Sequence, residues 1–293
     1  MRIKAFKAIF SLAENPSMDL KEMLAQLECS CESTRDLYLF MLSLVGPLTD
    51  EAAARIAAAR SKFNPTEEEK NPNMKFAENA LAPILAGDPD FDKIIKKRKM
   101  SWDQYDVFLR HLYDSLRQTE EYSRYMENPQ RSLKEDVELF VSIYTKLLPD
   151  NPELEDILED LSIWWNDDLE YSLSYCLKTF DELALGRSWS LPALFNPGDR
   201  DYIRGIVTQA HAAFDKYFQQ IADITPKWDK NRICTADLAL IVAGLSESAA
   251  NPGMDIRIII SEYVEISKFY STRESRGFVN GVLDNLLNKN KNN

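Results

Sequence analysis

The sequence predicts an all-α protein, and three observations support this fold class. Apolar side chains recur at spacings of three and four residues in one segment after another, which is the period of an amphipathic helix. Strand-like alternation of apolar and polar residues is nowhere sustained. Asn-Pro turn signals separate the apolar segments, as expected where helices end. Six of these dipeptides begin at Asn64, Asn71, Asn128, Asn151, Asn196 and Asn251.

The first predicted helix covers residues 1–13. Phe6 and Ile9 gather on one side of its helical wheel, and Lys4 and Lys7 fall on another. This arrangement is typical of a helix that buries one face and keeps the other in water.

Further helices are predicted along the middle of the chain. Residues 101–117 repeat aromatic and leucine side chains at helical spacing, and residues 133–148 and 154–165 do the same. Asp199 follows the turn residues 196–198 and is a good N-cap. The sequence therefore predicts that the final helices begin there.

The charge is distributed unevenly. The 293 residues carry a net charge of −12, made up of −13 in the first 199 residues and +1 in the last 94. Residues 150–182 hold eleven acidic side chains against the single Lys178, whereas the first twelve residues hold three basic ones and no acidic one. The acidic balance argues against a protein that coats nucleic acid indiscriminately. A local basic patch stays possible, because charges more than about 8 Å away are largely screened at physiological salt.

Several classes of protein are disfavoured. The longest uncharged apolar stretch, residues 37–49, is shorter than the roughly 20 residues that span a bilayer. No convincing secretory signal follows the basic start, so we expect a cytoplasmic protein. Four scattered cysteines predict reduced thiols rather than a disulfide framework. Cys29-x-Cys31 and two histidines do not complete a zinc site, and we expect no metal and no cofactor.

Enzyme motifs are also missing. The sequence has no G-x-G-x-x-G, G-x-x-x-x-G-K-[ST], H-E-x-x-H or G-x-S-x-G. We therefore expect no catalytic residues and a function other than catalysis.

The last third carries a specific pattern. I-S-E-Y-V-E-I-S-K at residues 260–268 is followed, after a turn, by F-V-N-G-V-L-D at residues 278–284. The pattern closely resembles the NusB family of bacterial transcription antitermination factors, in which an I-N-E-x-[VI]-E-[LI]-A-K helix precedes F-V-N-G-V-L-D. Four further segments resemble the family: residues 2–10, 201–207, 228–233 and 236–246.

The resemblance implies a NusB-like helical bundle with an additional acidic helical region. Its expected parts are a first helix at 1–13, an acidic helical insertion at 14–198 and an RNA-binding helical core at 199–293. The insertion is similar to that of long-form NusB proteins, with P-T-E-E at its 65–76 segment and W-N-D-D at 165–168. The resemblance does not supply a role for the insertion.

The resemblance also implies a function. NusB proteins bind boxA-type single-stranded RNA of ribosomal RNA leaders together with NusE, a small-subunit ribosomal protein, and act in the RNA polymerase antitermination complex, with no membrane partner. Cations on phosphates and aromatic faces on bases are the contacts such RNA requires. The positions that match the family's RNA surface are Arg2, Lys4, Lys7, Phe10, Tyr270, Glu274 and Phe278. Arg273 and Arg276 flank the C-terminal positions and are expected to add phosphate contacts. Asp237 matches a position at the NusE surface.

Some of these residues have a second interpretation. Phe10 lies on the apolar side with Phe6, and Phe278 starts an apolar helical stripe, so both can be core residues. Asp237 would also favour the dipole of its helix as a first-turn acidic residue. Asn280-Gly281 within a helix is interpreted as close packing with a buried amide.

Two other functions compete with antitermination through RNA. The acidic insertion can recruit a basic protein partner, with little RNA binding. Some RNA methyltransferases also carry a NusB-like domain, but this chain lacks the S-adenosylmethionine-binding domain that such an enzyme needs.

Overall fold

The computed structural model describes residues 1–187, 194–225 and 233–291. All regular secondary structure over these ranges is helical, with no strand, which confirms the predicted all-α fold. The predicted family match at residues 228–232 lies outside the described residues.

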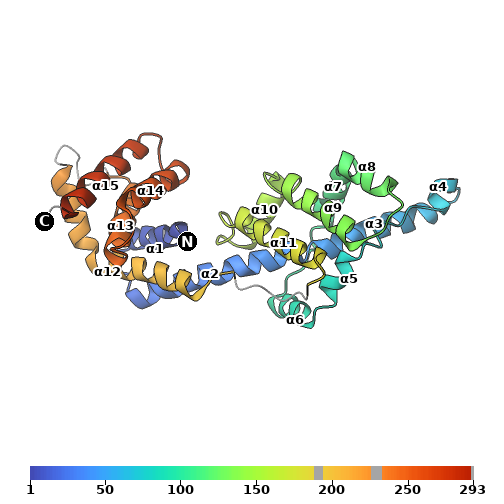
Figure 1. Cartoon of the computed structure of the whole chain (residues 1–293), viewed down its shortest axis with the longest axis horizontal. Coiled ribbons are helices and arrows are strands. Elements are labelled where there is room, and N and C mark those ends of the chain that lie inside the picture. Colours follow the sequence, from blue (N-terminus) through green and yellow to red (C-terminus); the bar gives the residue numbers. More distant parts are fainter. Residues whose placement is uncertain (188–193, 226–232, 292–293) are drawn as a thin grey trace. The chain divides into compact units, whose positions relative to one another are not determined.

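The chain forms two compact units, drawn in Figure 1. The first unit joins Met1–Cys31 to Phe195–Asn293, and the second is Glu32–Leu194. The units therefore divide at 31/32 and 194/195, whereas the sequence places its boundaries at 13/14 and 198/199. The difference at the first boundary arises because Met18, Met23 and Leu27 are buried in the same core as the first helix.

The first unit is built on one central helix. Its helices are α1 (Arg2–Glu14), the start of α2 (Leu20–Leu42), α12 (Pro197–Ile224), α13 (Thr235–Ala250), α14 (Ile256–Tyr270) and α15 (Ser275–Lys291). Residues 236–247 of α13 are all buried, and α13 contacts α1, α12, α14 and α15. A helix that is hydrophobic on every side belongs at the centre of a bundle. Gly244 permits the close approach of α15, because a Cβ there would lie 2.8 Å from Leu283 Cδ2.

The first helix belongs to this core although the second unit separates it from the rest in sequence. Phe6, Ile9 and Leu12 are at most 3% exposed, and they pack in the same cluster as α13. In Figure 1, α1 lies beside α13. The amphipathic pattern of the first segment is thus matched by a buried face.

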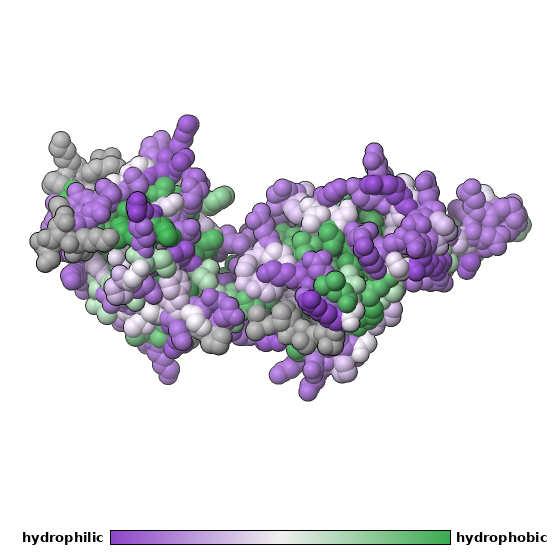
Figure 2. Space-filling model, in the orientation of Figure 1, coloured by the Kyte–Doolittle hydropathy of each residue, from purple (hydrophilic) through white to green (hydrophobic). Residues whose placement is uncertain are grey.

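The second unit contains the remaining helices. They are the rest of α2, α3 (Val45–Arg60), α4 (Glu67–Lys70), α5 (Leu81–Ala86), α6 (Pro89–Arg98), α7 (Asp106–Arg117), α8 (Glu120–Glu127), α9 (Leu133–Lys146), α10 (Pro152–Leu161) and α11 (Leu169–Ala184). On the face drawn in Figure 2, hydrophilic residues cover the α4 end of this unit.

Aromatic rings make up much of the core of the second unit. Phe76, of the segment at 65–76 that resembles long-form NusB proteins, has ring neighbours at 5.7–6.5 Å: Tyr113, Tyr122, Tyr125 and Phe140. The preceding Lys75 is also buried and donates to the carbonyls of Tyr125 and Asn128 at 2.7 and 2.9 Å. The segment therefore has a structural role within its unit.

Two predicted helices are shorter than the sequence indicates, because a tryptophan of each lies in a turn. Trp102 precedes α7, and its indole N–H donates to the Phe40 carbonyl at 3.2 Å. Trp165 follows α10, and its indole N–H donates to the Ser33 carbonyl at 2.9 Å. A buried tryptophan in a turn continues the apolar spacing of the helix beside it. The apolar pattern therefore predicted both helices to include their tryptophan.

Five of these six Asn-Pro signals begin at a helix cap, whereas Asn64 lies in the segment between α3 and α4. Asn151 and Asn196 are the N-caps of α10 and α12, each with proline in the first turn. The prediction that Asp199 is the N-cap is wrong by three residues. Asp199 instead lies in the first turn, where its carboxylate accepts the Asn196 backbone N–H at 3.0 Å. This is half of a capping box.

Two kinds of feature are absent from the described ranges. No helix there is long and apolar enough to cross a membrane. No group of three or more His, Cys, Asp or Glu side chains in the same part of the chain is arranged to hold a metal ion.

Candidate nucleic-acid interface

The first helix meets the C-terminal end of α14. The Phe6 and Tyr270 rings lie 5.1 Å apart between centroids, tilted by 57°. Lys7 Nζ lies 5.9 Å from the centroid of the Tyr270 ring, and the Phe10 ring lies 6.3 Å from that of Phe6. A cation and aromatic rings from two distant parts of the sequence thus lie at one place.

The turn that follows α14 is held by a buried carboxylate. Asp237, in the first turn of α13, is 6% exposed. Its two oxygens accept hydrogen bonds from Ser271 Oγ at 2.6 Å and Ser275 Oγ at 2.8 Å. The intervening Arg273 and Glu274 are exposed. Asp237 therefore fixes the start and the end of the turn that presents these charged side chains.

We call the surface formed by these elements the α1/α14 surface. Its members are Lys7, Phe10, Tyr270, Arg273, Glu274, Arg276 and Phe278. The arginines and Glu274 are exposed, and the other four are half-buried. Phe10 and Phe278 pack against the core and keep part of their rings accessible. Each ring therefore belongs partly to the core and partly to the surface.

Arg2 is engaged within the protein. Its guanidinium donates to both carboxylate oxygens of Glu247, with distances of 2.8 Å from Nε to Oε2 and from Nη2 to Oε1, and to Glu262 at 3.0 Å. The Glu247 side chain is fully buried, and that of Arg2 is 20% exposed. The hydrogen bonds to Glu247 raise the pKa of Arg2. Arg2 thus joins α1 to α13 and α14.

Two other predicted site residues are buried. Lys4 is 7% exposed, and its ammonium donates to the carbonyl and the hydroxyl of Ser30 at 3.0 and 3.1 Å. It therefore joins α1 to α2 and is not presented to a phosphate. Asp237, predicted at a partner surface, has the internal contacts described above.

The structure also gives residues that the sequence analysis did not select. Phe269 is 82% exposed in the last turn of α14. It falls in line with Glu262 and Glu265 on the polar side of the helix, so an aromatic residue on a polar stripe was the signal available in the sequence. Nothing in the local sequence marked Glu247, because its partner Arg2 is 245 residues away.

Asn280 and Gly281 correct the expectation of a buried amide. Both residues are exposed, and nothing lies within 4 Å of a Cβ built at Gly281. Close packing of α15 occurs instead at Gly244 of α13.

Comparison with known proteins assigns the family. The model of the NusB family matches residues 178–288. The transcription antitermination protein NusB of Finegoldia magna is 30% identical over 97 residues, which cover 33% of this chain and 71% of that protein. The chain belongs to the NusB family. The proteins of the same name from Herpetosiphon aurantiacus and Natranaerobius thermophilus are 31% and 28% identical over 99 and 94 residues, in each case 68% of the relative's length. They cover 33% and 32% of this chain.

The matched range contains most of the first unit. It spans α12, α13, α14 and all but the last residues of α15, whereas α1 lies outside it. The partial coverage is consistent with a long-form NusB protein. No solved structure matches the chain.

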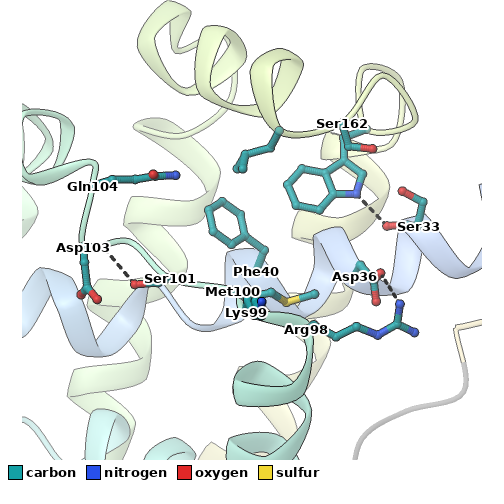
Figure 3. Close-up of a pocket in the computed structure, with 12 residues that line it drawn as sticks. Ser33, Asp36, Phe40, Arg98, Lys99, Met100, Ser101, Asp103, Gln104 and Ser162 are labelled. Atoms are coloured by element: carbon teal, nitrogen blue, oxygen red, sulfur yellow. Dashed lines mark hydrogen bonds and ion pairs between the residues drawn. The ribbon is translucent and has the colours of Figure 1, made fainter.

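The second unit, most of which lies outside the range matched by the NusB family model, has a pocket of its own, shown in Figure 3. Its volume is about 540 Å³, and it lies between α2, the segment after α6 and the end of α10. Phe40 and Gln104 point into the same space, and an ion pair of 3.0 Å joins Arg98 to Asp36 at its edge. Burial raises the pKa of Asp36, and Arg98 partly opposes this shift.

The aromatic residues of this pocket are arranged differently from those of the α1/α14 surface. Phe40 is stacked with Trp102 at 4.1 Å and with Trp165 at 5.4 Å. Phe40 and Trp165 are at most 7% exposed. The pocket therefore presents ring edges and polar groups, and its Phe40 ring has no open face on which a base could stack.

Proposed function

We propose that this protein is a transcription antitermination factor that binds boxA-type single-stranded RNA of ribosomal RNA leaders, together with NusE and RNA polymerase. Family membership supports the general role, because the relatives are named transcription antitermination proteins. The specific RNA and partners come from the resemblance of residues 260–284 to NusB proteins. No catalytic step is part of this role.

One observation carries the proposal: the Tyr270 ring lies 5.1 Å from Phe6 and 5.9 Å from Lys7 Nζ. This contact joins the first helix to the end of α14, which leads into the turn with Arg273 and the start of α15 with Arg276. Single-stranded RNA is held by stacking on aromatic faces and by cations on phosphates, and this surface offers both.

The proposed roles follow from the chemistry of each group. Tyr270 stacks on a base, and Phe10 and Phe278 extend the apolar contact. Lys7, Arg273 and Arg276 contact phosphates, and Glu274 accepts a hydrogen bond from a base amine. Arg2, Lys4 and Asp237 hold the surface in place through their internal hydrogen bonds.

The direct test is a titration of fluorescent boxA-like RNA with the full-length protein, with and without NusE. We expect saturable, sequence-dependent binding that weakens with salt. Tyr270→Ala should lose about 1–3 kcal/mol of binding free energy, where 1.4 kcal/mol is a factor of ten in Kd. Arg273→Ala should lower the slope of log K against log salt by about 0.7.

Arg257→Ala provides the matched control. Arg257 is 89% exposed at the opposite end of α14, where it pairs only with the neighbouring Asp255 among the ion pairs of the described chain. This variant should bind like the wild type. Binding that ignores the RNA sequence, or that Tyr270→Ala leaves unchanged, would contradict the proposal.

The alternative function, docking of a protein through the acidic insertion, has an observation in its favour. Leu161 and Ile163 are 39% and 73% exposed, and Leu161 lines the 540 Å³ pocket. Leu161→Asp with Ile163→Asp should then abolish antitermination while RNA affinity is kept. Unchanged antitermination in this double variant would leave the RNA surface as the better explanation.

A further inference from the structure

Phe269 has an exposed ring next to the proposed RNA surface. It is 82% exposed, although the apolar residues on the buried side of the same helix are at most 8% exposed. An isolated exposed apolar side chain is ordinary. The neighbours of Phe269 are what make it informative.

The chain neighbours of Phe269 include an aromatic residue and cations, while Glu262 and Glu265 precede it on the same stripe of α14. Tyr270 follows it directly, and the exposed Arg273 lies four residues further along the chain. Lys268, the preceding residue, pairs with Glu265. By contrast, Ile258 is 48% exposed on the same stripe of α14 but lies eleven residues away, or about 16 Å along the helix axis.

The two adjacent rings cannot hold the same base. Successive residues of a helix diverge by about 100° around its axis, so the side chains of Phe269 and Tyr270 leave the helix in different directions. The Tyr270 ring also packs against Phe6, whereas the ring of Phe269 is open to solvent. A strand with splayed bases would place two different nucleotides on the two rings.

We propose that Phe269 is a second nucleobase-stacking residue of the α1/α14 surface. It takes the base next to the one on Tyr270 as the strand passes over the end of α14. The inference rests on the proposed RNA-binding function and adds to it a contact that makes the bound strand longer by one nucleotide.

The test uses full-length protein with NusE and a boxA-like RNA carrying 2-aminopurine at single positions. Phe269→Ala and Phe269→Leu should weaken binding about five- to a hundredfold, the range for loss of one stacked base. Phe269→Trp should retain the affinity of the wild type. One RNA position should show fluorescence quenching that Phe269→Ala removes and Tyr270→Ala does not.

Three controls separate stacking from other effects. Phe63 is a 99% exposed phenylalanine of the second unit, and Phe63→Ala should not change binding, nor should Ile258→Ala. The salt dependence of Phe269→Ala should equal that of the wild type, because no charge is removed. Circular dichroism melts should also be unchanged, since the ring is exposed.

The failures can be told apart. If the wild-type protein does not bind the RNA, the proposed function is wrong. If it binds and Phe269→Ala binds equally well, only the inference about Phe269 is wrong. Equal affinities of Phe269→Leu and Phe269→Trp would show a simple apolar contact and overturn stacking. Loss of NusE binding with RNA affinity retained would identify a protein contact instead.

Discussion

The two units of the chain differ in charge. Glu32–Leu194 has 19 basic and 31 acidic side chains, a net charge of −12, whereas the rest of the chain has 16 of each and is neutral. The entire net charge of the protein therefore belongs to the second unit. A polyanion that approaches the first unit meets no net repulsion from that unit itself, and the proposed phosphate contacts remain usable at physiological screening.

The units also use aromatic residues differently. The second unit buries Phe76, Phe40 and Trp102 in stacked clusters. The first unit has a mainly aliphatic core around α13 and leaves Phe269 and part of Tyr270 at its surface. The buried rings of the second unit therefore act in stability, and rings of the α1/α14 surface are available for binding.

The largest expected effect is a loss of stability confined to the second unit. Phe76→Ala removes a ring that is 1% exposed and has four aromatic neighbours. Such a truncation costs about 3–5 kcal/mol. Hydrogen exchange measured by mass spectrometry should show faster exchange in α7, α8 and α9. The RNA titration should show unchanged affinity. Faster exchange in α13 would contradict the separation of the units.

Arg2→Ala should produce the reverse pattern. The variant leaves the buried Glu247 carboxylate without its main partner, and breaking such a pair costs about 3 kcal/mol or more. We expect faster exchange in α13 and α14, with α9 unchanged. Arg2→Ala combined with Glu247→Gln should recover part of the loss, because no buried charge remains. No recovery in the double variant would contradict the role of the ion pair.

A pair of glycine variants compares two helices of the first unit. Gly244→Ala should destabilise by about 1–3 kcal/mol, because its Cβ would lie 2.8 Å from Leu283 Cδ2 in a filled core. Gly281→Ala should stabilise by about 0.5–1 kcal/mol, because alanine is the better helix former and nothing lies within 4 Å. Urea unfolding measures both. Changes of equal sign would contradict the packing described for α13 and α15.

The smallest effect concerns the pocket of the second unit. Burial raises the pKa of Asp36, so ionisation of this carboxyl lowers the stability of the folded protein as pH rises through its folded pKa. Asp36→Asn should therefore be more stable than the wild type at neutral pH. The difference should vanish below the pKa of an unfolded aspartate, about 3.9. Thermal melts between pH 3 and pH 7 measure it, and a lower stability of Asp36→Asn at pH 7 would contradict this sign.

The sequence predicted the helices better than their ends. Apolar periodicity identifies α1, α9 and α15, and the resemblance to NusB proteins identifies α14. Periodicity cannot tell a helical tryptophan from Trp102 or Trp165, whose indoles bind backbone carbonyls of α2. Those contacts depend on tertiary packing, which a local pattern does not contain.

The candidate site shows the same limit. Lys4 and Lys7 share a polar side of one helix, yet α2 covers Lys4 and leaves Lys7 near Tyr270. Only the fold decides which of two similar lysines is buried. The roles of the α1/α14 residues in RNA binding stay predictions until the affinities are measured.

The position of α1 in the first unit has a consequence for biosynthesis. Its buried side needs α13, and at about 5–20 residues per second the ribosome takes about 10 to 40 s to make the residues between them. Phe6 and Ile9 emerge long before the α12 and α13 residues of their core exist, while the second unit can already fold. Chaperones that hold nascent chains would therefore meet α1 before α13 is made, and a product truncated before α13 would leave the α13-facing side of α1 exposed.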